Sequence, residues 1–279
     1  MNLTTPVDIA PSPLRIDHST PLLLMGSCFS DEIGARLQEG DFHVELNPFG
    51  ALYNPASIAA AVRRLVDDRP IGREDLVQNE GYWHSWHHHG SFSRKTQQEV
   101  LDACNRRIHQ AHRALRDDKL LMVTFGTAWV FELDGERLVA NCHKLPAAMF
   151  TRRRITEEEI VDTWQAFTAL HPTLFTVSPI RHMADGAHGN QLSKSTLLLA
   201  VDRLVGLCPD WRYFDSYEIL MDELRDYRFY ARDMCHPSDL AVDIVWQRFQ
   251  DTYMSLQTQS RCCQEEKAAR QALHRPIVQ

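Results

Sequence analysis

The sequence contains no long hydrophobic run and no excess of positive charge. Its longest apolar stretches, at 21–25 and 197–201, are only as long as a core strand or a short helical segment, whereas a membrane-spanning helix needs roughly 18 consecutive apolar residues. The 30 lysines and arginines are outnumbered by 37 aspartates and glutamates, which gives a net charge of −7 and an isoelectric point near 6.0. A protein that neutralises phosphates carries the opposite sign. We therefore expect neither a membrane nor a nucleic acid as a partner.

Signals for export and for disulfide bonds are also missing. Residues 1–13 have no basic segment followed by an apolar one, so they do not resemble a signal peptide. The 7 cysteines are an odd number and are scattered along the chain, which fits reduced thiols better than a disulfide framework. These features predict a cytoplasmic protein.

The composition is that of an ordinary globular protein, with 44% hydrophobic and 24% charged residues. No internal repeat and no linker rich in glycine, serine or proline divides the 279 residues. We therefore predict one domain over residues 1–256. A polar, helix-prone tail follows over 257–279, and we assign it no chemistry. The sequence leaves the oligomeric state open.

Apolar runs of strand length alternate with helical patterns along the chain. This alternation predicts right-handed crossovers and a mostly parallel five-stranded sheet with helices on both faces, which is a three-layer α/β/α fold. Asp134-Gly135 lies between two β-prone runs and predicts a β-hairpin insertion over 129–140. The expected strands are 22–25, 42–46, 119–125, 174–178 and 211–214. The expected helices are 30–37, 55–65, 100–115, 156–170 and 194–205.

A serine at the end of the first strand is the best candidate for a nucleophile. In an open parallel sheet, ligands bind beyond the carboxyl ends of the strands, and Ser27 follows the first strand at the start of a helix, where unpaired N–H groups favour negative charge. A serine needs a base, and Asp233 and His236 have the spacing for the carboxylate to orient the imidazole. The alternative is that Ser27 only caps the helix and that His236 is a surface side chain.

Other polar residues are expected near the same edge of the sheet. Asn47 and Asn54 follow the second strand, where they line the pocket or only form a turn and a helix cap. The pairs His143-Lys144 and Arg181-His182 are expected to bind an anionic part of the substrate; alternatively, they form ion pairs with Asp185 or another carboxylate in a loop.

We expect no metal and no cofactor. Four histidines lie close together, but no CxxC pair, no HExxH helix and no carboxylate at ligand spacing accompanies them. The nearby tryptophans indicate the wall of a substrate cleft or a packed insertion. The four histidines are His84, His87, His88 and His89.

Several unlinked motifs occur in one order over most of the chain, and together they resemble the GSCFA-domain family. That family is similar to the SGNH (GDSL-type) esterases and acyl hydrolases. The motifs are Gly26-Ser27-Cys28-Phe29-Ser30, Asn47-Pro48-Phe49-Gly50, Asn54-Pro55-Ala56-Ser57-Ile58, Thr124-Phe125-Gly126-Thr127-Ala128-Trp129, Asn141-Cys142-His143-Lys144-Leu145-Pro146, Thr176-Val177-Ser178-Pro179 and the Asp233-x-x-His236-Pro237 segment.

The resemblance implies a flavodoxin-like, SGNH hydrolase-like strand order and a Ser-His-Asp triad. In that mechanism Ser27 attacks an acyl carbonyl, His236 acts as base and then acid, and Asp233 orients the imidazole. It also implies that the N–H groups of Ser27 and Gly50 hold the oxyanion. The esterases use an asparagine after the third strand as a further donor. Here that segment is Gly126-Thr127-Ala128-Trp129, so the donor is Thr127, Asn141 or absent.

Three functions remain open at this stage. The first is a serine-dependent acyl-ester hydrolase, acting on a small-molecule or glycan ester such as an acetylated saccharide. The second is an O-acyltransferase that uses the same triad with a sugar or alcohol as acceptor. The third is a binding module whose oxyanion hole is incomplete.

Overall fold

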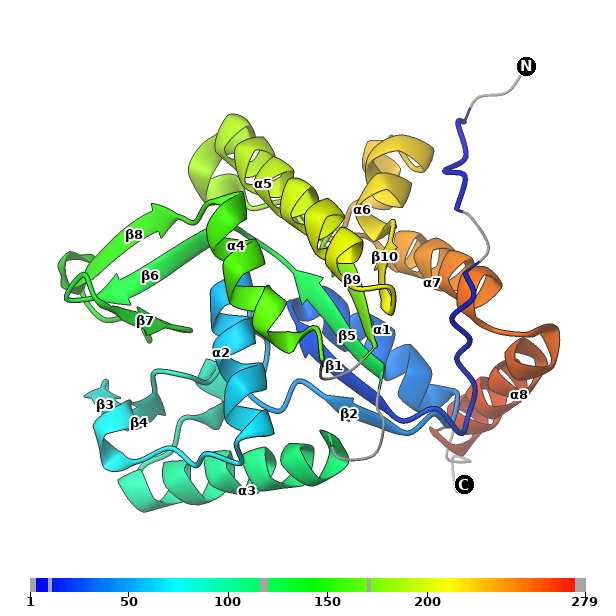
Figure 1. Ribbon diagram of the computed structural model, residues 1–279. Coiled ribbons are helices and arrows are strands. Elements are labelled where there is room, and N and C mark those ends of the chain that lie inside the picture. Colours follow the sequence, from blue (N-terminus) through cyan, green and yellow to red (C-terminus); the bar gives the residue numbers. More distant parts are fainter. Residues whose placement is uncertain (1–3, 10–11, 116–119, 170–171, 274–279) are drawn as a thin grey trace, which may run out of the picture.

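The computed structural model describes residues 4–9, 12–115, 120–169 and 172–273 (Figure 1). Lys119 at the expected start of the third strand, Leu170 at the expected end of a helix, and residues 274–279 of the tail lie outside the described residues. Across the described ranges, no helix combines the length and the apolar character that crossing a membrane requires.

A five-stranded parallel sheet forms the centre of the fold, with the order β10-β9-β5-β1-β2. Counted along the chain, this is the flavodoxin-like order, in which the first strand lies between the second and the third. Each expected strand is present, so the predicted three-layer α/β/α class is confirmed. The strands are β1 (Leu22–Gly26), β2 (Val44–Leu46), β5 (Leu120–Phe125), β9 (Thr173–Val177) and β10 (Trp211–Phe214).

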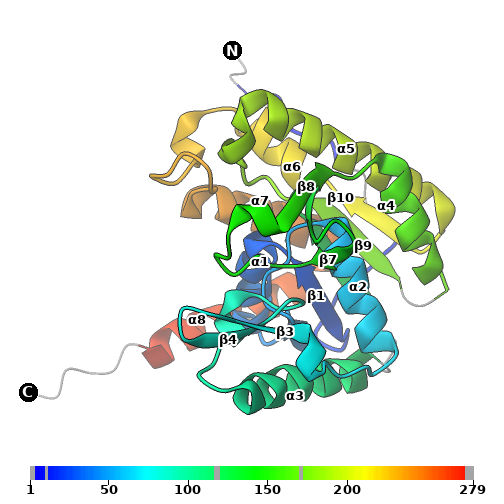
Figure 2. The same cartoon turned by 90° about the vertical axis from the view of Figure 1, so that its left-hand side faces the viewer.

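Helices cover both faces of the sheet because successive strand side chains point to opposite sides. In β1, Leu23 and Met25 pack into one core, and Leu22 and Leu24 pack into the other. The first core is covered by α2 (Pro55–Val66), α3 (Gln97–Leu115), α4 (Glu157–Trp164) and α5 (Gly186–Leu207). The second is covered by α1 (Cys28–Glu39), α7 (Asp239–Tyr253) and α8 (Leu256–Leu273) (Figure 2).

Local signals in the sequence account for the helix starts. Asn54 caps α2 by accepting the N–H of Ser57 at 2.7 Å, and Thr156 and Glu159 form the expected capping box of α4.

The tail is helical, as expected, but it is not simply a solvated face. The Cys262 side chain of α8 is buried, and Glu266 accepts a hydrogen bond from the Trp246 indole at 3.1 Å.

Two small antiparallel sheets are inserted beside the main sheet (Figure 1). The expected hairpin is present, and the strand after it, which the sequence analysis did not include, pairs with its first strand. The other sheet is a hairpin within the histidine-rich segment. The strands of the first are β6 (Trp129–Leu133), β7 (Arg137–Val139) and β8 (Phe150–Arg154), and those of the second are β3 (Leu76–Asn79) and β4 (Tyr82–Ser85).

Candidate active site

A cavity of about 380 Å³ lies at the carboxyl ends of β1, β5 and β9, where the flavodoxin-like order predicts a ligand. Trp129, Phe131 and Ile180 give it an apolar wall. Six of the residues expected from the sequence line this cavity together, although they come from segments far apart in the chain. They are Ser27, Asn54, Thr127, Arg181, His182 and His236.

The hydroxyl of Ser27 is enclosed and unused. Gly26 ends β1 with a φ of +153°, and a Cβ atom there would stand 2.4 Å from the Thr124 carbonyl oxygen, so only glycine permits the turn. Ser27 is the N-cap of α1, but its side chain makes no capping hydrogen bond. Its Oγ is buried without a hydrogen-bond partner in the described part of the chain. The cap interpretation therefore does not account for this side chain.

His236 and Asp233 form a tight pair on the loop before α7. Nδ1 of His236 lies 2.5 Å from Oδ2 of Asp233, and Oδ1 accepts the N–H groups of Cys235 at 2.9 Å and His236 at 3.0 Å. These hydrogen bonds lower the pKa of Asp233 to about 2. The carboxylate is therefore an acceptor at neutral pH. In the neutral form of the His236 ring, the proton lies on Nδ1 and Nε2 is the acceptor.

Arg181 connects the loop after β9 to this pair. Its N–H donates to the Cys235 carbonyl at 3.0 Å, and its guanidinium donates to the Met234 carbonyl at 3.2 Å. The expected ion pair between Arg181 and Asp185 is not formed, because Asp185 binds Arg152 through both oxygens at 2.5 and 2.7 Å. The guanidinium of Arg181 thus holds the His236 loop against the sheet.

The partly buried ring of His182 is neutral at pH 7. Burial, with the nearby charge of Lys194, lowers its pKa to about 4. Its Nε2 atom is buried, and no described residue hydrogen-bonds to it. The backbone N–H of His182 donates to Asn190 Oδ1 at 2.9 Å. His182 is thus a second neutral imidazole on the cavity, but its ring nitrogens bind no carboxylate among the residues described.

A lysine that the sequence analysis missed lies beneath the site. The Lys194 side chain is fully buried, and its Nζ donates to the carbonyls of Gly126 at 2.7 Å and Ser178 at 2.6 Å. Burial lowers its pKa to about 7. A Cβ atom on Gly126 would stand 3.4 Å from Ser27 Cβ, so the loop held by Lys194 contacts the serine. The sequence held one signal for this burial. Lys194 precedes Leu197 by one helical turn, so both fall on the same, buried face of α5.

Asn54 supplies an amide donor that faces the cavity. Because its Oδ1 accepts the Ser57 N–H, its Nδ2 is left without a protein partner in the described residues. Thr127 is less available: its Oγ1 lies 3.1 Å from Ser193 Oγ and accepts the Trp129 N–H at 3.2 Å. Asn54 is therefore the better placed of the two to donate to an oxyanion.

The oxyanion role that the resemblance assigns to Gly50 does not fit this structure. The Gly50 N–H donates to the Asn47 carbonyl at 2.7 Å within a turn, and Gly50 is not part of the cavity lining. Asn47 also lies behind the lining: its Oδ1 accepts the Gly26 N–H at 2.9 Å, and its Nδ2 donates to Asp31 at 2.7 Å. Asn47 thus supports the loop that carries Ser27. This agrees with the alternative that Asn47 forms a turn and does not line the pocket.

The comparison with protein families agrees with these motifs. The model of the GSCFA family matches residues 21–249, which include Ser27, Asp233 and His236. The chain belongs to the GSCFA family. No curated protein and no solved structure matches it.

Three predicted site residues of this GSCFA protein lie away from the cavity. Asn141, His143 and Lys144 line a separate hollow of about 400 Å³ beside the β3–β4 hairpin. There the His143 ring stacks on His84 with centroids 4.5 Å apart, and its Nε2 lies 2.8 Å from the Ser85 carbonyl oxygen. Their expected position on the rim with Ser27 is wrong, because the β6–β7 hairpin carries the chain away from the sheet edge.

The histidine-rich segment of the GSCFA chain makes structural contacts. His84 and His88 pair with Ser93 and Ser85 at 2.6 and 2.9 Å, and His87 lies 3.0 Å from Asp75. Within the described ranges, no three histidine, cysteine, aspartate or glutamate side chains are grouped so that they could hold a metal ion.

The serine-hydrolase hypothesis from the sequence predicts that Asp233→Asn lowers the kcat of ester hydrolysis by about 10²- to 10⁴-fold. An asparagine amide would donate to Nδ1 of His236, which moves the ring proton to Nε2 and leaves no base facing the serine. Steady-state hydrolysis of 4-nitrophenyl acetate measures the effect, and circular dichroism verifies the fold. Asp239→Asn, at the first turn of α7 and outside the cavity lining, should retain activity. An Asp233→Asn protein with wild-type kcat would contradict the role of the pair.

Proposed function

We propose that this GSCFA protein is a serine-dependent acyl-ester hydrolase of the SGNH type. The observation that carries the proposal is the pairing of two features on one cavity. Ser27 presents a buried hydroxyl that is unpartnered among the described residues, and His236 presents an imidazole whose other nitrogen is held by Asp233. A nucleophile, a base and an orienting carboxylate are the groups that acyl transfer requires.

The reaction proceeds in two halves. Nε2 of His236 accepts the Ser27 proton while Oγ forms a bond to the acyl carbonyl carbon, whose π electrons move to oxygen. The imidazolium then gives its proton to the leaving alcohol as the C–O bond breaks. Water repeats the sequence on the acyl-enzyme and releases the carboxylic acid.

The residues around Ser27 favour the negative charge that develops on the oxygen. The first turn of α1 directs N–H groups toward this position, and the Asn54 amide lies on the same cavity. Lys194 donates to the Gly126 carbonyl from directly behind this loop, and it adds positive charge there below about pH 7. Asn54 and Lys194 are themselves buried, where electrostatic interactions are stronger than in water.

The size of the cavity favours a short acyl group such as acetyl. A volume of about 380 Å³ is at the lower end for small-molecule sites, and it must hold both the ester and part of the carrier.

We also propose that the protein acts in the cytoplasm. The cysteines support this location, because all of them are free thiols.

Labelling with a fluorophosphonate tests the proposal. We expect one covalent adduct, located on Ser27 by peptide mass spectrometry. The labelling rate should fall strongly in His236→Ala and much less in His182→Ala. Of these two histidines on the cavity, His236 is the one whose ring pairs with a carboxylate among the described residues. A folded protein that takes up no label would be a binding module instead. A larger loss in His182→Ala would contradict His236 as the base.

The products distinguish hydrolysis from transfer. With an acetyl ester and a tenfold excess of free oligosaccharide, we expect acetic acid and no mass increase on the sugar. Acetylation of the sugar would identify the protein as an O-acyltransferase that uses the same serine.

A further inference from the structure

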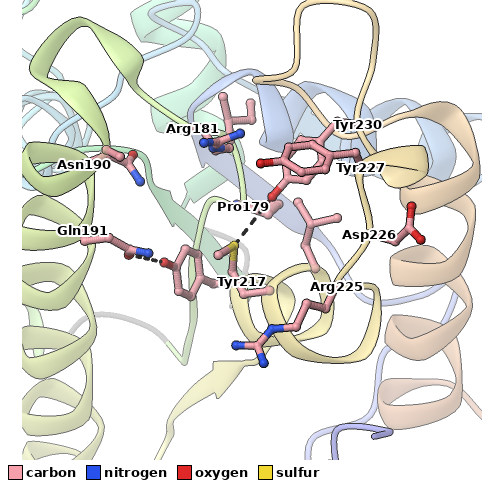
Figure 3. Close-up of a pocket in the computed structure, with 13 residues that line it drawn as sticks. Pro179, Arg181, Asn190, Gln191, Tyr217, Arg225, Asp226, Tyr227 and Tyr230 are labelled. Carbon is pink, nitrogen blue, oxygen red and sulfur yellow. Dashed lines mark hydrogen bonds between the residues drawn. The ribbon is translucent and has the colours of Figure 1, made fainter. Parts of the chain in front are cut away.

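A second cavity of about 260 Å³ adjoins the active-site cavity, and Ile180 and Arg181 line both (Figure 3). Figure 3 shows Asn190 and Gln191 entering it from α5, opposite the loop that carries Tyr227 and Tyr230. A molecule in this cavity would therefore be separated from the Ser27 cavity only by the side chains of the shared wall.

Three tyrosine rings line this cavity, beside aliphatic side chains such as Ile180 and Leu220. The Tyr217 hydroxyl donates to Gln191 Oε1 at 2.9 Å, and the Tyr230 hydroxyl lies 3.6 Å from the Met221 sulfur, so both rings are held in place. Tyr227 is 69% exposed, and its ring centroid lies 6.2 Å from that of Tyr230. Tyr227 therefore presents an aromatic face to solvent beside the cavity.

Apart from the Asp226 carboxylate, which accepts hydrogen bonds from Arg228, the polar groups of the cavity are mainly donors. Asn190 uses its Oδ1 to accept the His182 N–H, and Gln191 uses its Oε1 to accept the Tyr217 hydroxyl, so each amide N–H₂ is left for a ligand. The Arg225 side chain is 79% exposed at the rim, and its guanidinium lies 3.7 Å from the Asp222 carboxylate. The ligand should therefore offer several acceptor oxygens.

Aromatic faces combined with amide donors suit a sugar ring. A pyranose has an apolar C–H face that packs on a tyrosine ring and hydroxyl oxygens that accept from the amides. A fatty acyl chain would leave these donors unpaired and would remain in contact with water beside the exposed Tyr227. The open, mixed character of the cavity thus favours a saccharide over a hydrocarbon.

We propose that this second cavity binds a sugar residue of the substrate's carrier and that its O-acyl group reaches Ser27 across Ile180 and Arg181. This inference rests on the proposed function. It adds the substrate class, because it assigns recognition of the saccharide to a site distinct from the catalytic groups. It also explains why Asn190 and Arg181 connect the two sites: the first binds the backbone of His182, and the second binds the His236 loop.

Kinetics with two substrates test the proposal. For Tyr227→Ala we expect the KM for O-acetylated xylotriose or cellotriose to rise about tenfold, while kcat/KM for 4-nitrophenyl acetate stays within twofold of wild type. Tyr82→Ala removes another exposed tyrosine, which lines the separate hollow beside β3–β4, and should change neither. Equal losses on both substrates would overturn the proposal. A selective loss on 4-nitrophenyl octanoate would also overturn it by identifying an acyl-chain pocket.

Binding without turnover separates this inference from the proposed function. In Ser27→Ala protein, saturation-transfer NMR should detect unmodified xylotriose or cellotriose, and adding Tyr227→Ala should abolish the signal. If wild type hydrolyses no ester but this binding is present and depends on Tyr227, the saccharide site stands and the esterase proposal fails. If neither trisaccharide binds while esters are hydrolysed, the saccharide site is wrong and the esterase proposal stands.

Discussion

Ser27→Ala is expected to abolish ester hydrolysis, with a fall in kcat of about 10⁴-fold or more, and to leave the fold as stable as the wild type or more so. The activity is lost because the variant lacks the Oγ that forms the acyl-enzyme. The stability effect follows from the buried Oγ, which has no protein partner in the described residues. Removing an unsatisfied buried polar group raises the free energy of unfolding by about 1 kcal/mol.

Ser30→Ala is the matched control, and the opposite pattern is expected. Ser30 lies one turn further along α1 and is equally buried, but its Oγ donates to Thr124 Oγ1 at 2.8 Å and does not line the cavity. This variant should lose about 1 kcal/mol of stability and keep its activity. Urea unfolding and 4-nitrophenyl acetate hydrolysis measure the two effects. Equal activity in wild type and Ser27→Ala would eliminate the serine mechanism.

Lys194→Met is expected to remove a pH dependence of stability. The folded-state pKa of Lys194 is about 7, whereas a lysine in the unfolded chain titrates near 10.5. Between these values the unfolded state binds more protons, so the free energy of unfolding of the wild type rises with pH. Below about pH 7 the cost of burying the charge is fully present. Between pH 7 and 9 the wild type should gain about 2 kcal/mol relative to Lys194→Met.

Denaturant unfolding at a series of pH values measures this difference, and subtracting the two profiles removes the contributions of tyrosines and cysteines. Lys267→Met, an exposed position on α8, should give a profile parallel to the wild type. Parallel profiles for Lys194→Met and wild type would contradict the depressed pKa of Lys194.

The Lys194→Met variant should also lose about 10²-fold in kcat, because the carbonyls of Gly126 and Ser178 lose their hydrogen-bond donor behind Ser27.

The fold could be predicted from the sequence because its signals are local. The apolar run that becomes β1 is buried on both faces, as continuous hydrophobic strands of parallel sheets are, and the capping residues Asn54 and Thr156 define helix starts within their own turns. The Asp233–His236 pair also forms within a single loop.

The predictions that failed depend on where insertions carry the chain. Asn141 and His143 follow a hairpin whose direction depends on how it packs, and no spacing in the sequence records it. The same limit applies to Gly50: whether its N–H is available depends on the turn closed by the Asn47 carbonyl. Tyr227 and Tyr230 had no motif to mark them as neighbours of a cavity.

By itself, the sequence determined the layered α/β fold, the membership of the GSCFA family and the carboxylate–imidazole pair, since periodicity, motifs and short spacings act over a few residues. Only the tertiary structure decided that Ser27 and His236, from opposite ends of the chain, line one cavity. It also decided that Lys194 is buried beneath them and that a tyrosine-lined cavity adjoins them. These features arise from packing between distant segments, and such packing leaves no periodic signal in the sequence.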